Sequence, residues 1–206
     1  MTILILDTSQ TTSYACLCHE QKIEEFFTFT SNQDLSSSLA SHLQKLLNRP
    51  LSALALGIGP GSYTGTRVAA TFAKSLSYAL SLPLISYNSL LGFIPDSIES
   101  SFAFYYPTKS TSPYIFLGHK DPSCAIPFLS HTSSKDTLIT LDSAKLIAQH
   151  PELASKTFVK GQLNPPLLAK HLHQKFLAQD WLTPDNIDRL ALIYLQEHAL
   201  KESYIL

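Results

Sequence analysis

The fold of this 206-residue chain is decided by one stretch, Gly57-Ile58-Gly59-Pro60-Gly61-Ser62-Tyr63-Thr64-Gly65-Thr66-Arg67. A short apolar run, residues 53–56, precedes this stretch, and residues 68–80 follow it with helical spacing and no Gly or Pro. The three glycines and one proline of residues 57–61 permit a sharp turn, and the Ser62 hydroxyl can cap a helix. The stretch therefore predicts a buried strand, a glycine turn and a helix.

The helix expected over residues 62–81 has two different stripes. One stripe is apolar and is expected to face a core; its members are Val68, Phe72, Leu76 and Leu80. The other stripe, here called the small stripe, has only small residues at i, i+4 spacing: Gly65, Ala69, Ala73 and Ser77. A surface without bulk lets another helix approach closely. The small stripe is compatible with a close contact inside this subunit or with docking of a partner's helix.

The glycine turn is only a weak indication of a nucleotide site. A P-loop needs a Lys-Ser/Thr pair after its last glycine, and Gly65 is followed by Thr66-Arg67. A dinucleotide fingerprint places a third glycine where Ser62 stands. A tight strand-to-helix turn is therefore the better interpretation.

Residues 59–68 resemble the G-P-G-S-[FY]-T-G-x-R-[IV] signature of the TsaB/YeaZ family, and residues 3–9, Ile-Leu-Ile-Leu-Asp-Thr-Ser, are similar to its first strand and D-T-S turn. The resemblance covers roughly the first ninety residues. It implies a non-catalytic subunit of the bacterial machinery that makes tRNA threonylcarbamoyladenosine (t6A), the product of threonylcarbamoyl transfer to N6 of adenosine 37. The signature residues carried over to this chain are Gly59, Pro60, Gly61, Ser62, Tyr63, Thr64 and Arg67.

The resemblance also implies partners. In the family, the helices equivalent to residues 34–48 and 62–81 pack on the catalytic TsaD-like transferase, and similar surfaces form homodimers. An accessory TsaE-like ATPase is a further implied partner, whereas tRNA is contacted only indirectly. No catalytic residue, metal or cofactor is expected. The implied interface residues are Leu39, Leu43, Gly65, Ala69, Ala73 and Ser77.

The order of predicted elements defines the fold class. Strands over 2–6, 13–18 and 23–29, a helix from Asp34, strand 53–58, helix 62–81 and strand 83–86 read β-β-β-α-β-α-β. This order predicts an α/β fold with a mixed five-strand sheet, the layout of the ribonuclease H-like half-domain of the actin-like ATPase (ASKHA) superfamily. A stretch rich in Ser and Pro, 95–112, marks a boundary between an N-terminal domain, 1–95, and a smaller degenerate domain of the same type, 96–206.

The second domain has fewer recognisable elements. Residues 102–106 and 114–117 predict a hairpin, and 138–141 and 157–159 predict strands. Helices are expected over 143–149, from Asn164-Pro165 to about 179, and from Thr183.

Asp7, Thr8 and Ser9 form the turn after the first strand. In the ASKHA superfamily an Asp at this place handles phosphate or its metal ion. An Asp after a strand is also an ordinary turn former, and a second phosphate loop with its own Asp is not evident. The turn is therefore interpreted as vestigial, and an ATPase or kinase using Asp7 is kept as an alternative, as is a homodimer with an unrelated role.

Net charge, cysteine content and the lack of long apolar runs further restrict the classes of function. The formal net charge is −1, and the fifteen Lys and Arg are scattered, so another subunit is expected to supply most tRNA contact. Cys16, Cys18 and Cys124 lack the second ligand pair of a zinc site. A cytoplasmic protein is expected, without signal peptide or membrane span.

Three segments depart from the family pattern. Asp34-Leu35-Ser36 stands where a His-Ser pair is usual, residues 102–113 lack the D-A-R-x-G-E-V-Y segment, and Leu192–Gln196 replaces P-x-Y-L-R. No H-E-x-x-H, H-x-x-x-H or G-x-S-x-G motif is present, which argues against hydrolase and metal-dependent transferase chemistry.

Overall fold

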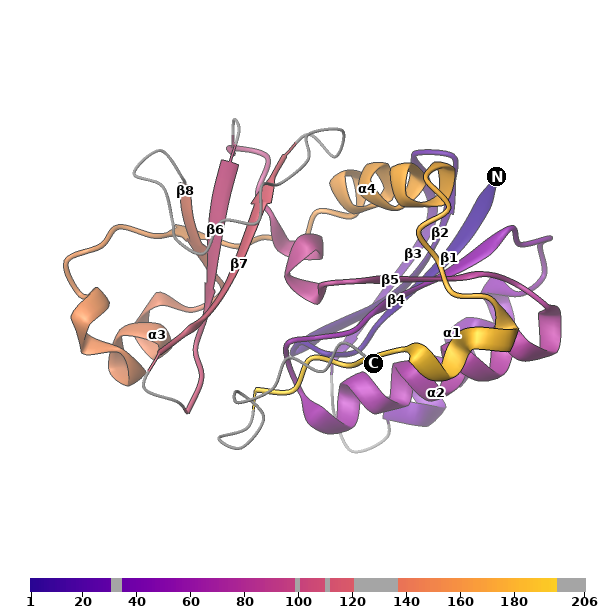
Figure 1. Cartoon of the computed structure of the whole chain (residues 1–206), viewed down its shortest axis with the longest axis horizontal. Coiled ribbons are helices and arrows are strands. Elements are labelled where there is room, and N and C mark those ends of the chain that lie inside the picture. Colours follow the sequence, from indigo (N-terminus) through magenta and orange to yellow (C-terminus); the bar gives the residue numbers. More distant parts are fainter. Residues whose placement is uncertain (31–34, 99–100, 110–111, 121–136, 196–206) are drawn as a thin grey trace. The chain divides into compact units, whose positions relative to one another are not determined.

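The computed structural model describes residues 1–30, 35–98, 101–109, 112–120 and 137–195. The described chain forms two compact units, one of residues 1–89 and 168–194 and one of residues 90–167. Each unit is built on its own sheet, five-stranded in the first and four-stranded in the second. Figure 1 shows the two sheets with their helices. The division into domains 1–95 and 96–206 remains a prediction.

The first sheet has the predicted mixed order. Three antiparallel strands form a meander: β1 (Thr2–Asp7), β2 (Thr12–His19) and β3 (Lys22–Thr30). Two further strands add in parallel to the other side of β1: β4 (Ala53–Gly57) and β5 (Leu84–Tyr87). The order across the sheet is β3-β2-β1-β4-β5, so the predicted element order and the mixed five-strand sheet are confirmed.

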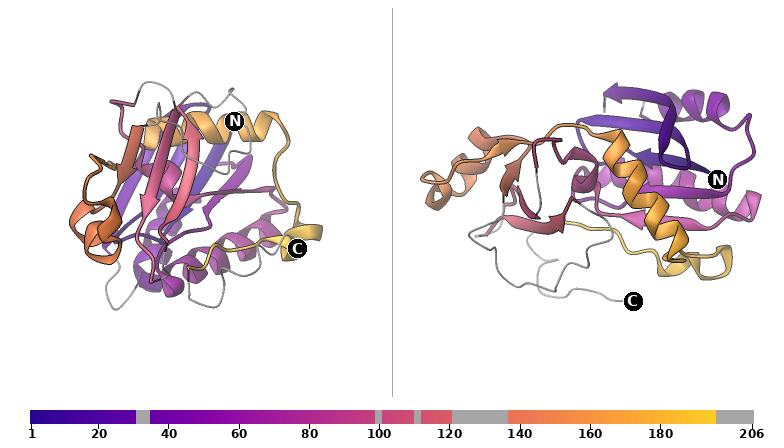
Figure 2. Two further views of the ribbon diagram at one scale, coloured as in Figure 1. Left: turned by 60° about the vertical axis from the view of Figure 1, so that its left-hand side comes forward. Right: turned by 90° about the horizontal axis from the view of Figure 1, so that it is seen from above.

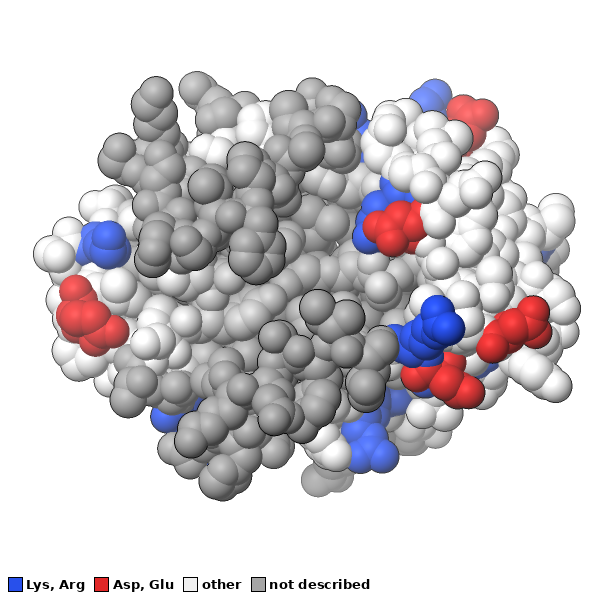
Figure 3. All heavy atoms as spheres, in the orientation of Figure 1, with Lys and Arg blue, Asp and Glu red and all other residues white. Residues whose placement is uncertain are grey.

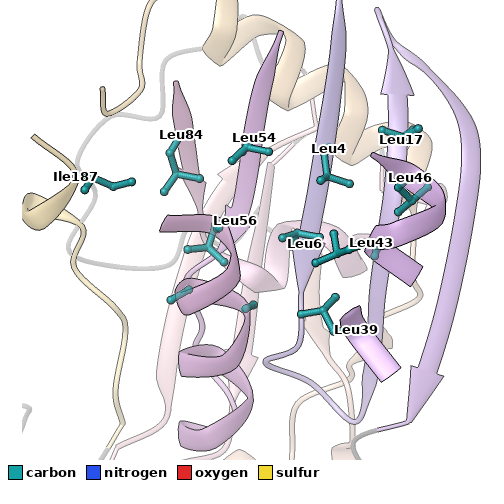
Figure 4. Packing of buried hydrophobic residues seen from close by; sticks show 14 residues of the cluster. Leu4, Leu6, Leu17, Leu39, Leu43, Leu46, Leu54, Leu56, Leu84 and Ile187 are labelled. Carbon is teal, nitrogen blue, oxygen red and sulfur yellow. The ribbon is translucent and has the colours of Figure 1, made fainter. Parts of the chain in front are cut away.

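Two helices cover one face of this sheet, α1 (Leu35–Leu46) and α2 (Tyr63–Leu80) (Figures 1 and 2). Leucines from the strands and from α1 form one buried cluster with the alanines of α2, and Figure 4 shows the leucines converging between sheet and helices. The opposite face lies beneath α4 (Pro165–Leu177) (Figure 1). The predicted helix start at Asp34 lies outside the described residues.

The second unit confirms the predicted hairpin. β6 (Ser101–Tyr106) pairs antiparallel with β7 (Tyr114–His119). On its other side β6 pairs in parallel with β8 (Thr137–Thr140), which pairs in parallel with β9 (Val159–Lys160). The helix α3 (Ser143–Gln149) has the predicted bounds, and Leu146 of α3 is buried with Ala103 and Tyr105 of β6.

Short helices complete the described chain. Three 3₁₀ helices, η1 (Ser89–Phe93), η2 (Pro151–Leu153) and η3 (Pro184–Arg189), connect the main elements. The segment expected to be a helix from Thr183 is therefore η3. Asn164 accepts a hydrogen bond from the backbone N–H of Leu167 (3.2 Å), which confirms it as the cap of α4.

Candidate partner interface

The backbone N–H groups of the glycine turn are occupied by the first unit itself. The N–H of Gly59 donates to the Ser89 hydroxyl (2.9 Å), and the N–H of Ser62 donates to the Ser9 carbonyl (2.6 Å). The N–H of Gly65 donates to the Ser62 hydroxyl (3.1 Å), so Ser62 is the predicted N-cap of α2. A phosphate cradle needs such groups to be free for a ligand. The turn is therefore a structural turn, as the sequence favoured.

Gly65 holds the first turn of α2 against β1. A Cβ at residue 65 would fall 1.9 Å from the Thr8 carbonyl oxygen, so only glycine fits there without displacement. The Thr8 hydroxyl donates to the Gly65 carbonyl (2.5 Å), and Thr8 is fully buried. The first turn of α2 is consequently locked to the D-T-S turn.

Asp7 is buried beneath this junction. Its Oδ1 accepts the backbone N–H of Ser9 (2.9 Å), and its Oδ2 has no hydrogen-bond partner. A Cβ at Gly57 would lie 1.9 Å from Oδ2, so the β4 backbone covers the carboxyl group. Burial raises the pKa of Asp7, although hydrogen bonds from Ser9 oppose the shift. Because Asp7 is 1% exposed, its side chain is not presented to a metal or a phosphate at the surface.

The small stripe lies inside the subunit. Ala69 and Ala73 are fully buried in the cluster that contains Leu39 and Leu43 of α1. Ser77 is also buried, and its hydroxyl donates to the Leu82 carbonyl (2.6 Å) just beyond the C-terminus of α2. Of the two interpretations of this stripe, the structure shows the contact within the subunit. The small stripe is therefore not open to a partner's helix in this structure.

The apolar stripe of α2 is only partly buried. Val68, Phe72 and Leu76 pack against the edge of the core cluster, and Leu80 is 47% exposed. The small stripe faces the sheet because the sheet already supplies large leucines, and alanines on the helix fit between them. The apolar stripe therefore meets the core at its edge, as expected for Val68, Phe72 and Leu76, whereas the small stripe is buried more deeply.

A hollow of about 320 Å³ opens on the outer side of α2 near its N-terminus. This outer hollow has contributions from both helices of the face: Ser36 of α1 and Tyr63, Thr64, Arg67, Val68, Thr71 and Phe72 of α2. Tyr63, Thr64 and Arg67 belong to the signature and are exposed. Sequence reasoning missed Ser36 and Thr71, although Tyr63, Arg67 and Thr71 recur at i, i+4 spacing on one side of the helix.

Tyr63 and Arg67 form one rim of the outer hollow, and Tyr194 lies against Tyr63. The Arg67 guanidinium donates to the Tyr63 hydroxyl (2.5 Å), and its carbon lies 5.1 Å from the ring centre. The rings of Tyr63 and Tyr194 are 4.9 Å apart. Burial and the neighbouring Tyr63 raise the pKa of Tyr194, whereas Arg67 opposes the shift. Aromatic rings in contact with an arginine are typical of protein contact surfaces.

Charge and metal chemistry are sparse in the described part of the chain. On the face seen in Figure 3, basic and acidic side chains are interspersed over the described surface. Among the described residues no group of three or more His, Cys, Asp or Glu is placed to hold a metal ion. Within the same part of the chain, none of the helices is long and apolar enough to cross a membrane. Cys16 and Cys18 are buried, and Cys124 lies outside the described residues.

Comparison with known proteins supports the resemblance that residues 59–68 indicated. Residues 33–118 match the family model described as TsaD: tRNA N6-adenosine threonylcarbamoyltransferase. A protein of Bacillus subtilis named tRNA threonylcarbamoyladenosine biosynthesis protein TsaB is 38% identical over 98 residues, which are 44% of this chain and 42% of that protein. A Haemophilus influenzae protein of the same name is 34% identical over 105 residues, or 48% and 44% of the two chains. The match thus spans less than half of each relative.

Solved structures extend the likeness of fold to nearly the whole chain. YeaZ from Pseudomonas aeruginosa has a TM-score of 0.67 at 16% identity, over 94% of this chain and 99% of that one. A protein described as similar to peptidase YEAZ from Pseudomonas aeruginosa has a TM-score of 0.65 at 15% identity, over 95% and 99%. The fold is that of YeaZ, an α/β protein with two mixed sheets, and part of the first unit lies within the match to the TsaD model. Within this class, the chain is similar in sequence to TsaB proteins over less than half of its length, and in fold to YeaZ over nearly its whole length.

Proposed function

We propose that this chain is a non-catalytic subunit of the t6A machinery, which holds the catalytic TsaD-like transferase in an active arrangement. The two curated relatives carry the name of t6A biosynthesis proteins, which supports the pathway. In the proposed reaction the transferase moves threonylcarbamoyl from its adenylate to N6 of adenosine 37 of tRNA. This chain contributes a docking surface, not a reacting group.

The observation that carries the proposal is the division of the signature into a buried and an exposed part. Gly59, Gly65 and the small stripe are used within the first unit to fix α2 on its sheet. Tyr63 and Arg67 lie outside, on the rim of the outer hollow. A rigid helix that displays aromatic and cationic side chains beside a part-apolar hollow suits a partner's side chain or helix. The proposed contact is therefore the outer hollow, and the residues implied by the resemblance position the helix that bears it.

A non-catalytic role agrees with the chemistry of the chain. The sequence lacks H-x-x-x-H, the metal motif of the catalytic paralogue, although residues 33–118 match the transferase model. The only candidate acid, Asp7, is buried with its Oδ2 against β4. The net charge of −1 also leaves tRNA contact to another subunit.

The test is the t6A content of tRNA. The gene for this chain is deleted, or its product depleted, and digested tRNA is analysed by mass spectrometry. The proposal predicts loss of t6A, restored by the natural chain and also by the Asp7→Asn variant. Undiminished t6A, or a failure of Asp7→Asn to restore it while the variant folds and accumulates normally, would contradict the non-catalytic role.

Two further partners remain part of the proposal. A TsaE-like ATPase and a second copy of this chain are both implied by the resemblance. Analytical ultracentrifugation of the purified chain, alone and with the transferase, distinguishes a homodimer that dissociates on mixing from one that persists. A cytoplasmic location also stays a prediction.

A further inference from the structure

A second hollow, of about 350 Å³, lies within the second unit at the carboxyl ends of two parallel strands. Thr140 ends β8 and Lys160 ends β9, and the two residues are partners in the strand register. The Gly161 N–H donates to the Thr140 carbonyl (2.8 Å), which fixes the two strand ends side by side. In open α/β sheets, ligands characteristically bind outside the carboxyl ends of the strands. The hollow is lined by Thr140, Leu141, Asp142, Ser143, Ala144, Phe158 and Lys160.

Thr140 has a buried hydroxyl without a partner. Thr140 is one of the residues that line the hollow; it is 1% exposed, and its buried Oγ1 forms no hydrogen bond. Buried side-chain oxygens in folded proteins nearly always have a partner, so such an atom calls for an explanation. A ligand that hydrogen-bonds the hydroxyl from the hollow provides that explanation.

One cation and one anion line the same hollow without neutralising each other. Lys160 and Asp142 take part in none of the ion pairs among the described residues, so their charged atoms are more than 4.0 Å apart. Asp142 uses one oxygen to cap α3 by accepting the Lys145 N–H (2.9 Å), which fixes the position of its carboxylate. An anion alone is repelled by Asp142 and a cation alone by Lys160, whereas a molecule with both charges pairs with each.

The remaining lining combines Ser143 with three apolar residues. Phe158 packs edge-on against Tyr105, with ring centres 5.4 Å apart, which holds its ring in place. Leu141 and Ala144 complete the apolar lining. Small-molecule sites combine an apolar surface with a few fixed polar groups, and this hollow offers both kinds of group, with the polar ones in excess.

We propose that this hollow binds a small zwitterion of the α-amino acid class. Its carboxylate pairs with Lys160 and accepts from the Thr140 hydroxyl, its ammonium group pairs with Asp142, and its side chain lies against Phe158. This binding site is distinct from the proposed partner surface on α2. If no zwitterion bound here, the proposed partner role would be unaffected.

The first test uses two zwitterions of different side chain, L-leucine and L-serine, titrated into the isotope-labelled full chain and followed by NMR. At least one is expected to give saturable shifts confined to residues 139–144 and 158–161. Two analogues each lack one charge of L-leucine: 3-methylbutylamine has no carboxylate, and 4-methylpentanoate has no ammonium group. Each is expected to bind roughly tenfold more weakly or worse. No saturable shift with either amino acid, or equal binding of an analogue, overturns the proposal.

Variants separate binding from folding. Lys160→Met and Asp142→Asn each remove one charge, and Asn keeps the capping oxygen, so both should fold and lose roughly tenfold in affinity. Thr140→Val is nearly isosteric; it should weaken binding and raise the Tm of the unliganded chain, because the unpartnered hydroxyl is gone. A lowered Tm for Thr140→Val, or unchanged affinity in Lys160→Met, contradicts the proposal. Lys156→Met, an exposed lysine outside the lining, is the matched control and should bind as the natural chain does.

Discussion

Thr8 and Gly65 lie in direct contact through their main chains, with the Thr8 carbonyl oxygen 1.9 Å from where a Cβ of residue 65 would stand. The Thr8 hydroxyl also donates to the Gly65 carbonyl, so the D-T-S turn and the signature turn form one buried junction. This junction sets how α2 lies on the sheet, and therefore which of its side chains reach the surface.

The first prediction concerns this junction. Gly65→Ala should lower the free energy of unfolding by about 2–3 kcal/mol, because the added methyl group must displace either α2 or the end of β1. Urea denaturation followed by circular dichroism measures the loss. Ser75→Ala, at an exposed position of the same helix, is the control and should change stability by less than about 0.5 kcal/mol. Equal stability of the two variants would show that residue 65 has room for a side chain.

The second prediction uses the raised pKa of Asp7. In the unfolded chain the carboxyl group has its ordinary pKa of 3.8, whereas in the folded chain burial keeps the proton to higher pH. The folded state therefore binds more protons than the unfolded state above that value, and this group's contribution to stability is lost as pH rises through the folded pKa. Asp7→Asn has no titrating carboxyl group and should not show this loss of stability. It keeps a side-chain oxygen that accepts the Ser9 N–H.

The test is the free energy of unfolding of the natural chain and of Asp7→Asn, each measured at pH 4 and pH 7. Relative to the natural chain, Asp7→Asn should be more stable at pH 7 than it is at pH 4. A shift in favour of Asp with rising pH would mean that the carboxylate is stabilised as an anion, and would reopen a phosphate or metal role for this turn.

The third prediction concerns the two buried cysteines. Burial raises the pKa of Cys18 to about 11 and that of Cys16 higher still. The thiolate fraction of Cys18 at neutral pH therefore falls about a hundredfold relative to its ordinary value. In a Cys124→Ser background, the thiols of Cys16 and Cys18 should each react with a disulfide reagent at least about a hundredfold more slowly in buffer than in urea. Rapid labelling of either in buffer would contradict the burial of β2.

The sequence predicted the first unit well because its signals are local. The glycine turn, the Ser62 cap and the alternating short strands each depend on a few neighbouring residues. They led to the element order and to the mixed five-stranded sheet that the structure confirms. The α3 bounds were also predicted, from an apolar segment that begins after Asp142.

The role of each face of α2 could not be predicted in this way. Helical periodicity separates Ala69 and Ala73 from Val68 and Phe72, but it does not say which stripe meets the sheet. That choice depends on the volume of Leu54, Leu56 and other strand residues distant in sequence. The deeper burial of the small stripe was therefore not predicted, and an outer hollow with a residue from α1 was missed.

The hollow in the second unit was missed for a related reason. Thr140 and Lys160 are twenty positions apart, and only the parallel pairing of β8 with β9 brings them together. A two-residue strand such as β9 has too little periodicity to reveal this register from sequence.

The central claim is that the outer hollow of α2 contacts the transferase, and its most direct test is the Kd of the full chain for the TsaD-like subunit. Thr71→Glu adds a charge to an exposed residue of the hollow without disturbing the core, whereas Ala178→Glu adds the same charge at an exposed residue after α4. The account predicts at least about tenfold weaker binding, or about 1.4 kcal/mol, for Thr71→Glu and an unchanged Kd for Ala178→Glu. Equal affinity of both variants and the natural chain would contradict it.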